Sequence, residues 1–262
     1  MKDRCALDFR LSAQSSTLHE QLLELARNMG LDGESLMRES QEMRIPLGRN
    51  GGTVATLRAH RNDTSLERVL RPETRRDLYG LLEHRAWDGA HTMPSLLDIG
   101  AHVGLSALLF LALHPAARVF AFEPAAVSFF YLAWNIAANN ATSVVLRHSG
   151  LSSGGLPMAF EYSPDDSTSS TGTAYGRAFG RLPVQRDVAR TLSLSEVVRS
   201  CGVRNITLVK LDCEGVKGRR YGKSAMRMIV SVHAQCTLDL LYARALTNAH
   251  ASRLLRKHRL RI

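Results

Sequence analysis

Residues 96–104, LLDIGAHVG, lead from a short apolar run that ends in an acid, through a turn with two glycines, into the apolar residues 105–113. A strand that enters a helix through a glycine turn is typical of an open α/β sheet, whose ligands bind at the carboxyl ends of the strands. Gly100 lets the backbone come close to a ligand, and Gly104 permits close packing at the helix start. The stretch therefore predicts a ligand-binding turn on a parallel sheet.

The spacing of this turn is not that of a dinucleotide-binding turn. A GxGxxG turn has a second glycine that makes room for a pyrophosphate on the helix N-terminus. Here Ala101, His102 and Val103 occupy the corresponding stretch. We therefore expect a ligand other than a dinucleotide, and the alternative is a turn that only joins a strand to a helix.

The residues that follow alternate between short apolar runs and helical stretches, which indicates a parallel sheet with crossover helices. Residues 149–181 are rich in Ser, Gly and Thr, and this composition predicts a mobile loop rather than a packed element. We expect strands at 96–99, 118–122, 143–146 and 205–211, a weaker fifth strand at 228–232, and helices at 105–113, 125–138 and 193–200.

The first 90 residues predict a mainly helical extension, and residues 91–262 the α/β domain. Thr17 and Glu20 have the spacing of a capping box at the start of a helix over residues 17–29. Asn-Gly-Gly at 50–52 is a turn signal, after which Val54 to Leu57 predicts a strand. A second capping pair and Pro72 predict a helix that runs to about Arg85.

The composition of the 262 residues, with 45% hydrophobic and 22% charged, is that of one ordinary globular domain with a buried core. No apolar run approaches the roughly 20 residues of a membrane span, and residues 1–10 lack a secretory signal, so we expect a cytoplasmic protein. The four cysteines stand far apart without zinc-ligand spacing, so no metal site is expected. The net charge of +10 favours anionic partners, although the basic run at 253–261 is most simply a solvated tail.

Acidic residues follow two of the expected strands. Glu123 ends the second strand, where a carboxylate can accept hydrogen bonds from both ribose hydroxyls of an adenosine; the alternative is an exposed loop glutamate. Residues 210–215, KLDCEG, place a lysine and two carboxylates at the end of the fourth strand. Alternation predicts that Lys210, Asp212 and Glu214 point to one side, near the glycine turn, where a second reactant would lie; the alternative is a solvated loop.

Taken together, these motifs resemble the FkbM family of methyltransferases that use S-adenosylmethionine (SAM). The resemblance implies a Rossmann-like class I methyltransferase sheet and transfer of a methyl group to a hydroxyl of a small molecule, sugar or glycan. It covers about residues 95–215 and rests on residues 98–104, 122–124, Asn135 with Asn139, 191–193 and 210–215.

The resemblance also implies roles for single residues. Carried over by position, the cofactor-binding residues are Asp98, Gly100, Ala101, His102, Gly104 and Glu123, and the catalytic residues at the transfer site are Asp212 and Glu214. Asp212 is the expected general base for the acceptor hydroxyl. The sequence departs from the family's pattern at His102 and Ser193, where asparagine and aspartate are usual, and throughout the segment after Gly215.

Two other functions stay open at this point. A nucleic-acid 2'-O-methyltransferase would use the net charge of +10 and the pair Lys210 and Asp212, but aromatic residues make up only 6% of the chain, which argues against base stacking. A non-catalytic binding module that keeps the sheet and the SAM pocket would explain the divergent segment after Gly215. The sequence indicates neither the acceptor nor an oligomeric state.

Overall fold

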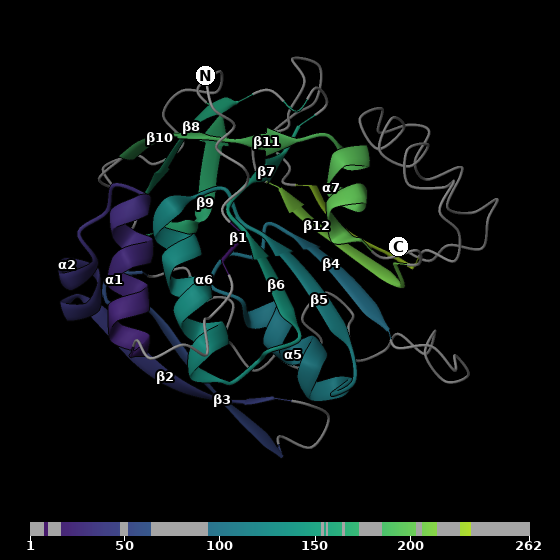
Figure 1. Ribbon diagram of the computed structural model, residues 1–262, viewed down its shortest axis with the longest axis horizontal. Coiled ribbons are helices and arrows are strands. Elements are labelled where there is room, and N and C mark those ends of the chain that lie inside the picture. Colours follow the sequence, from purple (N-terminus) through teal and green to yellow (C-terminus); the bar gives the residue numbers. More distant parts are fainter. Residues whose placement is uncertain are drawn as a thin grey trace.

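The computed structural model describes residues 8–9, 17–47, 52–63, 94–152, 155, 157–163, 166–172, 185–202, 206–213 and 226–231. Its centre is a six-stranded sheet in the order β1-β6-β5-β4-β12-β13 (Figure 1). The four inner strands run parallel and the two edge strands antiparallel to their neighbours. The strands are β1 (Asp8–Phe9), β4 (Ser95–Ile99), β5 (Arg118–Phe122), β6 (Val144–Arg147), β12 (Leu208–Cys213) and β13 (Met226–Ser231).

Helices cover both faces of this sheet. Helices α5 (Leu105–Leu113) and α6 (Ala126–Ala138) share one apolar cluster with alternate strand residues such as Leu96 and Val119. Helix α7 (Leu194–Cys201) contributes Val197 to a second cluster, formed with the intervening residues such as Leu97 and Phe120. The result is a mixed α/β fold with a parallel sheet, compatible with the predicted Rossmann-like class.

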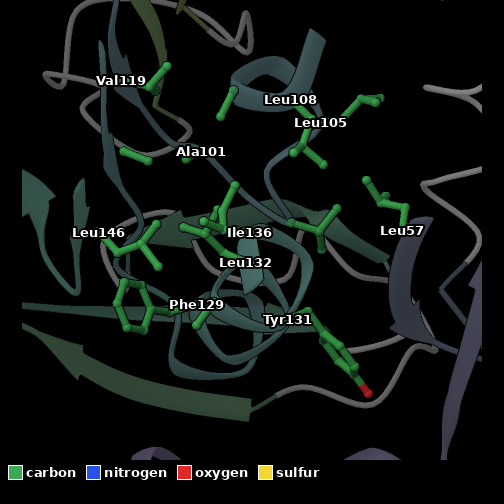
Figure 2. Packing of buried hydrophobic residues seen from close by; sticks show 14 of the residues in the cluster. Leu57, Ala101, Leu105, Leu108, Val119, Phe129, Tyr131, Leu132, Ile136 and Leu146 are labelled. Atoms are coloured by element: carbon green, nitrogen blue, oxygen red, sulfur yellow. The ribbon is translucent and has the colours of Figure 1, made fainter. Parts of the chain in front are cut away.

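The N-terminal region packs on the outside of α6. It consists of α1 (Leu18–Asn28), α2 (Gly33–Arg38) and a hairpin of β2 (Ser40–Leu47) and β3 (Thr53–His60). Figure 2 shows Leu57 of β3 at the same apolar cluster as Leu132 and Ile136 of α6. Helix α6 is buried nearly all round because it lies between the sheet and this region.

The hairpin adds two strands to a region that the sequence predicts to be mainly helical. The helix at 17–29 with its Thr17–Glu20 capping box is confirmed, and so is the strand near Val54, but β2 was not predicted. Ile45 and Leu47 are buried on one side of β2 while Pro46 between them is exposed, so a proline is tolerated at this edge. The helix expected to run to Arg85 lies outside the described residues.

The prediction of a mobile loop at 149–181 is wrong for residues 158–163 and 166–172. Strands β8 (Met158–Ser163), β9 (Asp166–Gly172) and β10 (Gln185–Ala189) form a three-stranded antiparallel sheet, and β7 (Gly150–Leu151) pairs with β11 (Thr191–Leu192). Phe160 and Ser163 are buried, so β8 contributes to the packed structure. Serine and threonine residues are compatible with strands because threonine is β-branched, and their abundance alone does not indicate a loop.

The other elements of the main sheet agree with the sequence. The predicted bounds of α5 and β5 are those observed, and β4, β6, α6, α7 and β12 are displaced by a few residues at most. The weaker fifth strand appears as β13, antiparallel to β12. No helix within the described residues is long and apolar enough to cross a membrane.

Candidate functional site

The glycine turn closes over the end of the neighbouring strand. The amides of Gly100 and Ala101 both donate to the Phe122 carbonyl at the end of β5, each at a distance of 2.9 Å. Gly100 and Gly104 have φ of 78° and 92°, a region that favours glycine. A Cβ on Gly104 would lie 2.8 Å from Leu132 Cδ1 of α6, so a side chain at this position would displace the Leu132 side chain. Both glycines are therefore required by the conformation of the turn.

His102 also adopts a left-handed conformation, with φ of 53°. Histidine and asparagine are among the residues that tolerate this region better than most others. The departure from asparagine noted in the sequence therefore preserves a residue type suited to the turn. The consequence is that the His102 amide points towards β5.

Glu123 accepts a hydrogen bond from that amide. Its Oε2 accepts a hydrogen bond from the His102 amide at 2.8 Å, and its Oε1 accepts one from the Ala125 amide at 2.9 Å. The side chain is buried, and burial raises the pKa of Glu123 from its ordinary value of 4.5 to about 7, against the opposing effect of the two backbone hydrogen bonds and of Lys210. A buried carboxylate with a raised pKa at the edge of a sheet is a typical feature of a functional site.

The raised pKa of Glu123 predicts a pH-dependent stability. Between pH 4.5 and about 7 the folded protein holds a proton on Glu123 that the unfolded chain has released, so the free energy of unfolding falls as the pH rises through this window. The shift corresponds to about 3 kcal/mol. Urea denaturation of the wild type and of Glu123→Gln at pH 5 and pH 8 measures it.

Gln cannot ionise, so the Glu123→Gln variant should lose less stability between the two pH values than the wild type. The difference between the two proteins isolates Glu123 from every other group that titrates in this range. Equal pH dependence of the two proteins would show that Glu123 titrates near its ordinary pKa.

A buried ion pair lies next to the glycine turn and is hydrogen-bonded to it. Lys210 on β12 lies opposite Asp98 on β4 in the parallel register, and its Nζ is 2.9 Å from Asp98 Oδ1. The same Nζ donates a short hydrogen bond to the Gly100 carbonyl, and Ser106 Oγ of α5 donates to Asp98 Oδ2 at 2.5 Å. Lys210 is 2% exposed and Asp98 is fully buried. In this structure Asp98 therefore holds the turn through protein groups, and its direct contact with a cofactor stays a prediction.

The two predicted catalytic residues are placed only in part. Asp212 lies in β12 directly after Leu211, which pairs with Ile99 at the end of β4. Its backbone is therefore at the carboxyl edge of the sheet beside the glycine turn, as the sequence predicts. Glu214 lies outside the described residues.

Two further residues of the site were not predicted. Ser106 is one of many small residues on a helix, and only the fold shows that it faces Asp98. Asn135 was noted in the sequence without a role, and its side chain donates to the Val103 carbonyl in the turn at 2.9 Å. A polar residue within the otherwise apolar run of α6 was the available signal.

The described residues contain no cluster of three or more His, Cys, Asp or Glu side chains that would hold a metal ion. Cys201, the cysteine whose surroundings are described, is a buried free thiol, and burial raises its pKa to about 12. The site thus offers backbone amides, a buried carboxylate and a glycine turn. These groups suit the binding of a hydroxylated, polar ligand.

Comparison with known proteins gives one informative similarity. No family model matches the chain. Over 152 aligned residues the chain is 31% identical to a protein named methyltransferase sdnD, from Sordaria araneosa. The alignment covers 47% of this chain and 58% of that protein, so the chain spans little more than half the length of the curated relative.

Proposed function

We propose that this protein is a SAM-dependent methyltransferase that transfers the methyl group to a hydroxyl of a small molecule, sugar or glycan. The observation that carries the proposal is the buried Glu123 carboxylate at the end of β5, bonded to the amide of His102 in the glycine turn. The similarity to a curated methyltransferase supports the transferase activity. The finer assignment to O-methylation rests on the resemblance of the sequence motifs to the FkbM family.

The residues present fit an adenosine-containing cofactor. An ionised carboxylate has about four acceptor sites, and the two backbone amides use two of those of Glu123, which leaves acceptors for the two ribose hydroxyls. The left-handed conformations of Gly100 and Gly104 form the turn at the edge of the sheet. Glu123 would hold the ribose, and Gly100, Ala101, His102 and Gly104 would line the rest of the cofactor.

When bound, SAM supplies a methyl group on a good leaving group. The protein then has to align the acceptor oxygen with that methyl group and to remove the proton of the acceptor hydroxyl. Asp212, at the edge of the sheet beside the turn, is the proposed base for this proton, with Glu214 as a second acid at the transfer site. The ion pair of Lys210 and Asp98 would keep the turn fixed during the reaction.

Lys210 is not available to an anionic acceptor. Its side chain is 2% exposed and its ammonium group is bound to Asp98 and to the Gly100 carbonyl. The nucleic-acid alternative, which needs a lysine near the reacting hydroxyl and the phosphates, therefore loses one of its two supports. The net charge of +10 still favours an anionic acceptor through long-range attraction.

Calorimetry with SAM and with S-adenosylhomocysteine tests the proposal, at pH 8, where Glu123 is ionised despite its raised pKa. The wild type should bind both, and Glu123→Ala should bind each at least roughly tenfold more weakly, because it lacks charge-assisted hydrogen bonds worth about 1.5 to 3 kcal/mol each. Glu161→Ala is the matched control, since Glu161 lies on β8 in an ion pair with the exposed Arg186, and this variant should bind as the wild type does.

Melting temperatures of the variants separate loss of binding from loss of folding. Absence of binding of either ligand to the folded wild type would refute the proposed cofactor. Binding that is unchanged in folded Glu123→Ala would refute the role of Glu123 but leave the cofactor assignment in place.

A further inference from the structure

Two asparagines of α6 bind the backbone of β3 as a neighbouring strand would. Asn135 Oδ1 accepts from the Arg58 amide at 2.6 Å, and its Nδ2 donates to the Arg58 carbonyl at 2.9 Å. Asn139 repeats the pattern one helical turn later, with 2.9 Å from the Thr56 amide and 2.6 Å to the Thr56 carbonyl. Each side-chain amide therefore satisfies both backbone groups of one residue on the edge of β3 that β2 leaves unpaired.

The spacing of the two asparagines follows from the geometry of helices and strands. Four residues along a helix rise about 6.0 Å, and two residues along a strand about 6.7 Å. Asparagines four apart on α6 can therefore face residues two apart on β3. Only a side-chain amide offers a donor and an acceptor together at this reach, so neither aspartate nor leucine would replace asparagine without leaving a backbone group unpaired.

The two asparagines differ in their third hydrogen bond. Asn139 Nδ2 donates its other hydrogen bond to the Asn135 carbonyl within α6, at 2.7 Å. Asn135 Nδ2 instead donates to the carbonyl of Val103, the residue before Gly104 in the glycine turn. Asn135 is fully buried, and it alone of the pair connects β3 with the turn.

We propose that Asn135 is a positioning residue that fixes the glycine turn, residues 100–104, against β3, so that the N-terminal hairpin is a working part of the cofactor site. The consequence for cofactor affinity rests on the proposed function, whereas the consequence for the turn does not. Arg58 strengthens the attachment, because its guanidinium lies 4.8 Å from the centre of the Trp134 ring on α6. A displacement of the hairpin would thus be transmitted to the turn by the hydrogen bonds of the Asn135 side chain.

The pair Asn135→Ala and Asn139→Ala tests this role. Both variants lose two hydrogen bonds to β3, so both should show faster hydrogen exchange in a peptide covering residues 53–60. Only Asn135→Ala should show faster exchange in a peptide covering residues 98–105, by roughly tenfold, and roughly tenfold weaker binding of S-adenosylhomocysteine. If Asn135→Ala does not fold, Asn135→Leu and Asn139→Leu, which fill the space of the side chain without burying a charge, give the same comparison.

Equal exchange in residues 98–105 of both variants, whether raised or unchanged, would overturn the proposal, because a merely structural role is shared by the two asparagines. Faster exchange of the turn in the Asn135 variant alone supports it. The exchange measurement uses no ligand, so it decides the role of Asn135 even if the wild type binds no S-adenosylhomocysteine. That last result would refute the proposed function alone.

Discussion

Methyl transfer by an Asp212→Asn variant is expected to be roughly 100-fold to 10,000-fold slower than by the wild type, the range typical of the loss of a general base. Asparagine keeps the shape of aspartate but cannot take up the proton of an acceptor hydroxyl. SAM affinity and melting temperature should change little. The effect should therefore appear in turnover and not in binding or folding.

The position of Asp212 along the sheet is the reason for this expectation. Strand β12 runs parallel to β4, and the last registered pair, Leu211 with Ile99, immediately precedes Asp212 on one strand and the glycine turn on the other. The carboxyl ends of parallel strands are where ligands of α/β sheets bind. The backbone of Asp212 thus lies at the edge of the sheet where Glu123 and the turn would hold the cofactor.

Transfer of radiolabelled methyl from SAM to a panel of hydroxylated small molecules, sugars and glycans identifies an acceptor for this test. Asp32→Asn is the matched control, because Asp32 caps α2 through a hydrogen bond to the Ser35 amide and asparagine caps a helix equally well. Turnover near the wild-type value in Asp212→Asn would show that alignment of the reactants suffices. An unfolded variant would instead give Asp212 a structural role.

Much of the main sheet was predictable because its strands and helices are continuous apolar runs, and glycines, prolines and acids separate one run from the next. Strand β5 and helix α5 were predicted to the residue. Strand β2 was missed because its sequence, SQEMRIPL, contains two exposed charged residues and a proline, although its buried residues alternate with exposed ones as in a strand. Strands β8 and β9 were missed because a Ser- and Thr-rich composition was interpreted as a loop.

Site residues that end a strand were predictable from the sequence. Site residues that contact partners far away in the sequence were not. The glycine turn and Glu123 follow from local sequence. The pairing of Lys210 with Asp98 requires the register of β12 against β4, which no local pattern gives. The contact of Asn135 with β3 joins residues 77 positions apart, and Asn135 by itself is one asparagine on an apolar helix.

Removal of the lysine from the buried ion pair of Lys210 and Asp98 should cause a large loss of stability. Lys210→Met keeps much of the apolar stem but leaves the Asp98 carboxylate buried without its counterion and the Gly100 carbonyl without a donor. Breaking a buried pair in this way costs about 3 to 5 kcal/mol of unfolding free energy. Urea denaturation at pH 7, followed by far-UV circular dichroism, measures the loss.

Two further variants determine whether that loss comes from the unpaired charge. Arg186→Met breaks an ion pair whose arginine is 81% exposed, and it should cost no more than about 1 kcal/mol. Asp98→Asn combined with Lys210→Met removes both charges while Ser106 can still donate to the amide oxygen, so it should recover part of the stability lost in Lys210→Met. A double variant no more stable than Lys210→Met would mean that the bond to the Gly100 carbonyl, rather than the charge of Asp98, is what Lys210 contributes to the turn.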